Sequence, residues 1–135
     1  MTIALDTTAL VARYVSGPGH IAVLAAMADD RDWCASALAL TEATVLIERL
    51  AEPAQVRGLR GLLLEDWAHF AIVPVDQACL ERAAELARAH PLRTIDALHL
   101  AAADRLPRPI RYATLDPHQI PVAESLGFEV VSPTT

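Results

Sequence analysis

Short apolar segments alternate with longer helical patterns along the chain, and this alternation constrains the fold more than any other feature of the sequence. Alternating strands and helices predict an α/β fold with a central, mostly parallel sheet and helices on both of its faces. The pattern predicts about five strands, at 2–5, 33–36, 70–75, 111–114 and 128–131. Helices are expected near 8–16, 19–29, 38–50, 53–68, 76–89, 95–105 and 117–126. Prolines and glycines between these segments, such as Gly127 after the last helix, support this division.

The composition is typical of one globular domain spanning residues 1–135. Hydrophobic residues make up 53% of the chain, which is enough for a buried core. No apolar run is long enough to span a bilayer, and Asp6 interrupts the N-terminal segment before a signal-peptide core could form. We therefore expect a soluble, cytoplasmic protein without membrane association. Cys34 and Cys79 lack the spacing of a zinc site and are expected to be small core residues.

The net charge of −6 argues against a surface that binds nucleic acids through general attraction to phosphates. A local basic rim is still compatible with this charge. Four arginines are expected near the carboxyl ends of the predicted strands, where they could contact phosphates or could equally be ordinary surface residues: Arg13, Arg93, Arg108 and Arg111.

Acidic residues follow two of the predicted strands. In parallel α/β sheets, ligands bind beyond the carboxyl ends of the strands. Asp6 stands at the end of the first strand, and Asp116 stands just past the end of the fourth. These two carboxylates are therefore expected at the same edge of the sheet.

Two more acids lie on helix faces that are expected to point inward. Glu42 is spaced to share a face with Leu38, Val45 and Leu46, and Asp96 enters its helix beside Ile95 and Leu98. A carboxylate in such a position needs a partner. The chain contains no lysine and no obviously placed arginine that would neutralise all four acids, whereas a divalent cation could do so.

Each acid also has a simpler structural interpretation. Asp116 before Pro117 has the pattern of a helix N-cap, as does Asp76, and Asp6 could cap the first helix. Asp96 could complement the positive end of its own helix. Capping and metal binding are compatible, because a carboxylate has two oxygens with several lone pairs. His99 shares a face with Asp96, but a histidine there is more often a core residue, so it is left out of the catalytic set.

Four segments together resemble the PIN-domain nucleases, in particular the VapC-type toxins of bacterial toxin–antitoxin pairs. They are "DTTALV", "LTEATVLIERL", "RTIDALHLAAA" and "YATLDPHQIPVAESLGFEVV", and the resemblance extends over essentially the whole chain. The resemblance implies a three-layer α/β/α fold in which four acids coordinate Mg²⁺, with Mn²⁺ able to substitute. By motif position these acids are Asp6, Glu42, Asp96 and Asp116, and the hydroxyls of Thr8 and Thr114 support the site.

The resemblance also implies an activity and partners. It implies endoribonuclease action on structured RNA, such as tRNA or ribosomal RNA, a homodimer, and inhibition by a cognate antitoxin protein. One departure stands out, because "DPHQI" occupies the place where an aromatic residue often follows the last aspartate.

The residue types suit phosphodiester hydrolysis by themselves. Hard oxygen ligands favour Mg²⁺ or Mn²⁺ over zinc, and such ions can activate water and stabilise charge on phosphoryl oxygens. A haloacid-dehalogenase-type phosphatase is disfavoured, because Thr8 stands where that family needs a second acid. A non-catalytic PIN-like binding module with a vestigial metal site is the alternative, since the presence of the acids does not establish activity.

Overall fold

The computed structural model describes residues 1–133 and joins five parallel strands in one sheet. The strand order is β3-β2-β1-β4-β5, so the first strand of the chain lies in the middle. Every strand overlaps a segment expected from the sequence, which confirms the predicted parallel sheet. The strands are β1 (Thr2–Leu5), β2 (Asp32–Ser36), β3 (Ala71–Val73), β4 (Ile110–Ala113) and β5 (Glu129–Val131).

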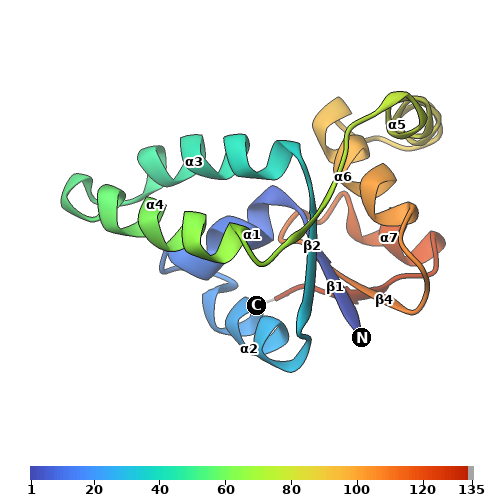
Figure 1. Ribbon diagram of the computed structural model, residues 1–135. Coiled ribbons are helices and arrows are strands. Elements are labelled where there is room, and N and C mark those ends of the chain that lie inside the picture. The colour runs from blue at the N-terminus through green and yellow to red at the C-terminus, as the bar shows by residue number, and fades with distance from the viewer. Residues whose placement is uncertain (134–135) are drawn as a thin grey trace.

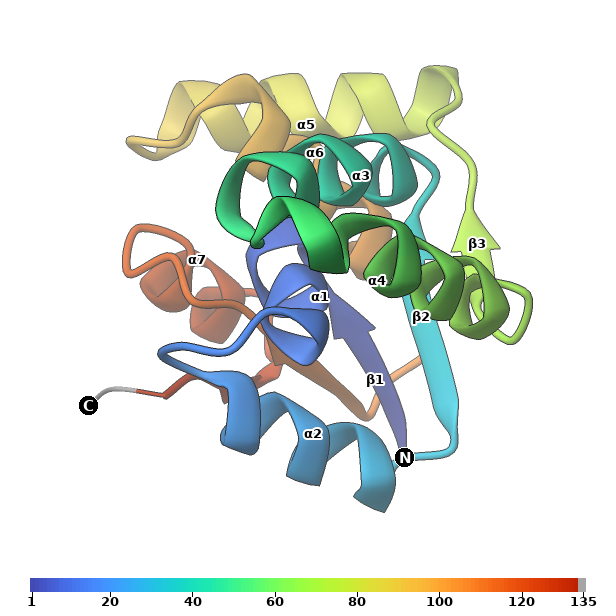
Figure 2. The same cartoon turned by 90° about the vertical axis from the view of Figure 1, so that its left-hand side faces the viewer.

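Helices cover both faces of the sheet and complete a three-layer α/β/α arrangement (Figure 1). One layer contains α1 to α4 and faces the viewer in Figure 2, while α5 to α7 form the other layer behind the sheet. Within residues 1–133 the helices are α1 (Thr7–Tyr14), α2 (His20–Asp29), α3 (Leu38–Leu50), α4 (Pro53–Trp67), α5 (Gln77–Ala89), α6 (Thr94–Asp104) and α7 (Ile120–Ser125).

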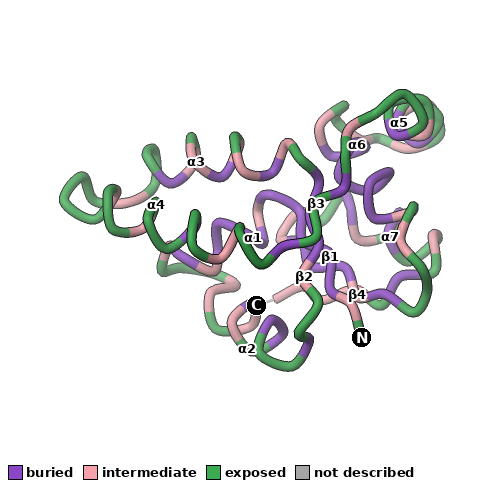
Figure 3. The backbone as a smooth tube through the Cα atoms, viewed as in Figure 1, coloured by how far each residue is buried: buried purple, intermediate pink, exposed green. Residues whose placement is uncertain are grey.

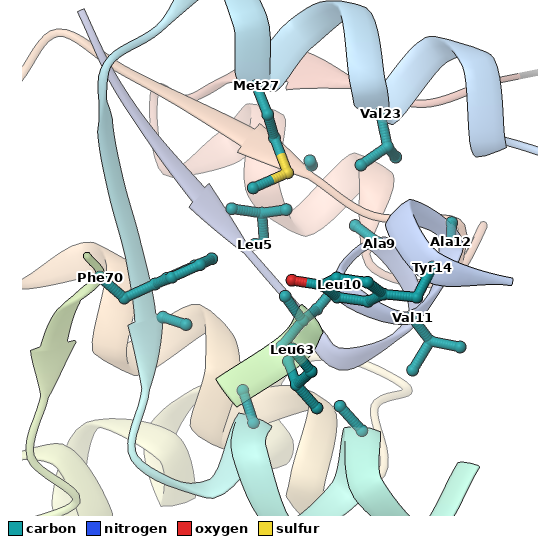
Figure 4. Close-up of a cluster of buried hydrophobic side chains, with 14 of the residues drawn as sticks. Leu5, Ala9, Leu10, Val11, Ala12, Tyr14, Val23, Met27, Leu63 and Phe70 are labelled. Atoms are coloured by element: carbon teal, nitrogen blue, oxygen red, sulfur yellow. The ribbon is translucent and has the colours of Figure 1, made fainter. Parts of the chain in front are cut away.

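Strand β1 is buried on both faces, which fixes the position of its carboxyl end. Successive side chains of a strand point to opposite faces. Ile3 and Leu5 accordingly pack into the core formed with α1 to α4, and Ala4 packs into the core formed with α5 to α7. Figure 4 shows the first of these cores, where Leu5 lies near Met27 of α2. The residue that follows β1 is therefore held by both layers.

The predicted helix starts are mostly correct, and the start of α7 is the exception. Asp6 caps α1 by accepting from the Ala9 N–H, and Asp76 caps α5 in the same way. The helix expected over 117–126 instead begins at Ile120, so Asp116 is not its N-cap. Asp116 Oδ1 accepts the backbone N–H of His118 at 3.0 Å, which closes a turn ahead of the helix. This turn places Gln119 against the sheet.

The degree of burial differs between the helices (Figure 3). Most residues of α6 are buried, whereas α4 is largely exposed. Both cysteines are free and buried, as expected. Across residues 1–133, no helix combines the length and apolar character needed to cross a bilayer.

Candidate active site

The predicted acids gather where the connections of the sheet diverge. From β1 the chain continues outward through β2 and β3 on one side, whereas β4 and β5 lie on the other. Asp6 directly follows β1, and Asp116 lies three residues beyond β4. Asp96 lies in the first turn of α6 and Glu42 in the second turn of α3. This is the edge of the sheet at which ligands are expected to bind.

Asp6 is buried and accepts four hydrogen bonds. Its Oδ1 accepts from the Thr8 hydroxyl at 2.7 Å and from the Ala9 N–H at 2.9 Å. Its Oδ2 accepts from the Thr114 hydroxyl at 2.7 Å and from the side-chain amide of Gln119 at 2.9 Å. Burial raises the pKa of Asp6 above its usual value, and the bonds from Ala9, Thr8 and Thr114 offset the rise only in part. Both threonines named from the sequence therefore bond directly to Asp6.

Gln119 joins three of the four acids through one atom. Its amide nitrogen Nε2 lies 2.9 Å from Asp6 Oδ2, 3.1 Å from Asp96 Oδ1 and 3.4 Å from Asp116 Oδ2. The hydroxyl of Tyr112 donates to the amide oxygen at 2.7 Å, which directs the nitrogen toward the acids. Gln119 is completely buried. These distances bring Asp6, Asp96 and Asp116 together around a single point.

Asp96 has a second partner, Arg93, which was named from the sequence only as a possible phosphate contact. Arg93 donates to Asp96 Oδ2 through Nε at 2.9 Å and to Oδ1 through Nη2 at 3.1 Å. The arginine side chain is 74% exposed and the aspartate side chain 6% exposed, so the guanidinium covers a buried carboxylate from the solvent. Asp96 is therefore paired with an exposed guanidinium group.

Glu42 lies in the same cleft but contacts a different set of residues. The fully buried stripe of α3 consists of Ala39, Ala43 and Ile47. The face expected to point inward is therefore only partly buried: Leu38 and Leu46 pack against the cores, whereas Val45 is exposed. The reason is that α3 packs on α1 through small residues, which leaves Glu42 half-buried at the border of the helix contact. As a partly buried carboxylate requires, Glu42 nevertheless has hydrogen-bond partners.

His99 and Thr7 hold the Glu42 carboxylate. Thr7 donates to Glu42 Oε1 at 2.5 Å, and His99 Nε2 lies 2.6 Å from the same oxygen. His99 Nδ1 lies 3.1 Å from the Ser36 hydroxyl. Burial opposes ionisation of Glu42, but the bonds from His99 and Thr7 outweigh it and lower the pKa below its usual value. Glu42 is therefore an ionised carboxylate in a fixed position.

The cleft above these side chains has a volume of about 500 Å³. Asp6, Glu42, Asp96 and Arg93 line it, and Asp96, Arg93 and Asp116 also line the adjoining hollow. Among residues 1–133, no three His, Cys, Asp or Glu side chains are already arranged as a set of metal ligands. The side chains nevertheless fit a hard cation, because carboxylate oxygens from three segments lie within 3.4 Å of one atom, Gln119 Nε2.

Of the arginines considered as phosphate contacts, Arg93 alone lines this cleft. The other three form ion pairs elsewhere: Arg13 with Asp66, Arg108 with Asp104, and Arg111 with Asp30. Sequence reasoning left Gln119 and His99 outside the site. In "DPHQI" only the missing aromatic residue after Asp116 was noted from the sequence, and Gln119 was not singled out.

Replacing Thr114 by valine should test how much these polar contacts stabilise the site. Thr114 is fully buried, donates to Asp6, and accepts the Asp116 N–H at 3.0 Å. Valine keeps the shape but leaves that N–H unpaired, so we expect a loss of about 2 kcal/mol in the free energy of unfolding. Urea denaturation measures it. The matched control is Thr44→Val, which loses only a bond to the Leu40 carbonyl. Equal stability of Thr114→Val and the unmodified protein would contradict the expectation.

Comparison with known proteins shows similarity along almost the whole chain. A family model described as PIN domain matches residues 3–132. The chain is 33% identical over 133 residues to Ribonuclease VapC46 of Mycobacterium tuberculosis, covering 98% of each protein. Its fold is similar to that of a toxin-antitoxin complex from Klebsiella pneumoniae, with a TM-score of 0.72 and 18% identity over 97% of each chain. FitAcB from Neisseria gonorrhoeae also gives a TM-score of 0.72, with 20% identity over 97% of each chain.

Proposed function

The chain belongs to the PIN domain family, and on this premise we propose that it is a divalent-metal-dependent endoribonuclease and the toxin of a toxin–antitoxin pair. One observation carries the proposal: carboxylates of Asp6, Asp96 and Asp116 all lie within 3.4 Å of a single buried nitrogen at the carboxyl edge of the sheet. The similarity to a protein named a ribonuclease supports RNA as the substrate.

Asp6, Asp96 and Asp116 would hold Mg²⁺, or Mn²⁺ in its place, with Glu42 as the fourth acid of the site. When bound, such a cation would supply charge stabilisation at the phosphoryl oxygens and favour the ionised form of water. Glu42 contributes an ionised carboxylate whose position is fixed by His99 and Thr7. The exposed guanidinium of Arg93 lies at the rim of the cleft, where it can contact an RNA phosphate.

A protein partner is proposed as well. The similar structure from Klebsiella pneumoniae is a toxin-antitoxin complex. In this chain, α3 and α4 expose large apolar side chains that a protein partner or a second copy would cover. They are Val45, Leu50, Leu62 and Leu64, which are 40–61% exposed. We propose that the antitoxin and the homodimer contact draw on this surface.

RNA cleavage tests the proposed activity directly. Purified protein, freed of any co-purifying partner, is incubated with total tRNA and ribosomal RNA in Mg²⁺ or Mn²⁺ and, in parallel, in EDTA. We expect discrete fragments that EDTA abolishes, because the acids need the cation to act on a phosphodiester. Intact RNA in every sample, with metal binding demonstrated separately, would favour the second candidate, a binding module. The Gln119 and Arg93 contacts favour that candidate, since they already satisfy Asp96.

Divalent metal should also raise the melting temperature. The raised pKa of Asp6 means that its ionisation costs folding free energy once the pH exceeds the usual value of the group. A nearby cation reduces that cost, and binding to the folded state alone stabilises it by about 2.7 kcal/mol at a concentration of 100 Kd. Calorimetric melting in Mn²⁺ and in EDTA measures the shift. An unchanged melting temperature at saturating Mn²⁺ would contradict a metal site among these acids.

A further inference from the structure

Gln119 occupies the point that the acids surround, and no other group in the cluster touches all three of them. Its nitrogen carries two protons, which serve Asp6 at 2.9 Å and Asp96 at 3.1 Å, while Asp116 Oδ2 lies farther away at 3.4 Å. An amide nitrogen donates hydrogen bonds but does not ligate a divalent cation. Donor and cation therefore compete for the same carboxylate oxygens.

The other donors to Asp6 are fixed by the backbone. The Thr8 hydroxyl accepts the Leu115 N–H at 2.9 Å, and the Thr114 hydroxyl accepts the Asp116 N–H at 3.0 Å. Each hydroxyl thus has its proton directed at Asp6 and its oxygen held by the chain. The side-chain amide of Gln119 has no backbone partner among the described residues, and besides the acids it bonds only to the Tyr112 hydroxyl. Of the two donors to Asp6 Oδ2, the Thr114 hydroxyl is anchored to the backbone and the Gln119 amide is not.

We propose that the Gln119 amide is a built-in placeholder for the cation, which holds Asp6, Asp96 and Asp116 together in the metal-free protein and is displaced from them when a divalent ion binds. This inference rests on the proposed metal site. It explains why the carboxylates are gathered although, among residues 1–133, they are not yet arranged as ligands. Tyr112 is the positioning residue of the device, because its hydroxyl sets which end of the amide faces the acids.

The inference predicts a direction that an ordinary structural role would not produce. Gln119→Met keeps the length of the side chain and removes both N–H donors. The metal-free acids then repel one another with no hydrogen-bond donor between them. The metal-free protein should melt at a lower temperature, while its affinity for Mn²⁺ should rise by about tenfold, since the cation no longer displaces hydrogen bonds to charged groups. Replacing a residue that only packs, or one that ligates the cation, would leave the affinity for Mn²⁺ unchanged or lower it.

Titration calorimetry with Mn²⁺ on EDTA-treated protein, together with melting curves with and without Mn²⁺, tests this. Gln119→Met should bind more tightly and show a larger Mn²⁺-induced rise in melting temperature. Tyr112→Phe should shift both quantities in the same direction by less. Gln77→Met, which removes an exposed amide bond to Glu81, should leave both unchanged.

The two proposals fail in different ways. If the unmodified protein binds Mn²⁺ and both Gln119→Met and Tyr112→Phe bind it with equal or lower affinity, the placeholder role is overturned and the metal site stands. If no variant binds Mn²⁺, the metal site is lost and the placeholder role with it. Binding by Gln119→Met alone would support the placeholder role in its strongest form.

Discussion

Asp96→Asn should reduce RNA cleavage by about 10³-fold, because losing one anionic ligand forfeits several kcal/mol of charge stabilisation at the phosphoryl oxygens and each 1.36 kcal/mol is tenfold in rate. The fold should survive this change. Asparagine keeps the oxygen that can accept from Gln119, and Arg93 is exposed enough to turn its guanidinium to the solvent. Initial rates on a fragment-yielding RNA measure the loss, and circular dichroism verifies the structure.

The same helix provides the matched control for Asp96→Asn. Asp104 lies at the other end of α6, where it pairs with Arg82 and Arg108 away from the cleft. Asp104→Asn weakens those pairs, so it should lower stability slightly and leave cleavage unchanged. If both variants cleave RNA as fast as the unmodified protein, Asp96 has no part in the reaction. Retained antitoxin binding by Asp96→Asn would separate loss of chemistry from loss of partner recognition.

The sequence alone predicted the edge of the sheet at which the candidate acids gather, because that location follows from topology. Alternating strands and helices require a parallel sheet, and β1 is apolar on both faces, so Asp6 had to emerge at the carboxyl edge. Asp116 follows β4 for the same reason. Asp96 was singled out because it enters its helix beside Ile95 and Leu98, on a face expected to pack inward, and it is indeed buried.

What the sequence could not predict depends on how side chains meet across distant segments. The turn that closes through Asp116 Oδ1 shifted the start of α7 by three residues from the expected position, and this shift brought Gln119 into the cluster. Periodicity also failed to predict which stripe of α3 is most buried, because Ala39 and Ala43 with Ile47 are fully buried while the larger Leu38 and Leu46 are only partly so. Small residues permit close helix packing, and apolar size alone does not report which face is buried.

His99 is a second residue whose burial could be predicted from the sequence but whose partner could not. A histidine among leucines and alanines is typical of a satisfied core residue, and His99 is indeed buried and hydrogen-bonded. What the pattern could not reveal is that its partner is Glu42, a predicted site acid 57 positions away in the chain. Thr7 gives its one hydroxyl proton to Glu42, so in the neutral ring Nε2–H donates to the carboxylate and Nδ1 accepts from Ser36.

His99→Phe is therefore expected to reduce RNA cleavage by about 10- to 100-fold, the usual effect of removing a partner that orients a metal ligand. Phenylalanine fills the same space but leaves Glu42 without its ring donor, so Mn²⁺ affinity should fall in parallel while the fold persists. His99→Gln, whose amide can donate to Glu42, should recover part of both. The matched control is His69→Phe, an exposed histidine beyond α4, which should change neither. Steady-state cleavage rates and Mn²⁺ titration measure the two effects together. If His99→Phe is less stable but cleaves RNA and binds Mn²⁺ like the unmodified protein, His99 has a role in core packing only. Removal of a residue that positions Glu42 must alter cleavage or Mn²⁺ affinity.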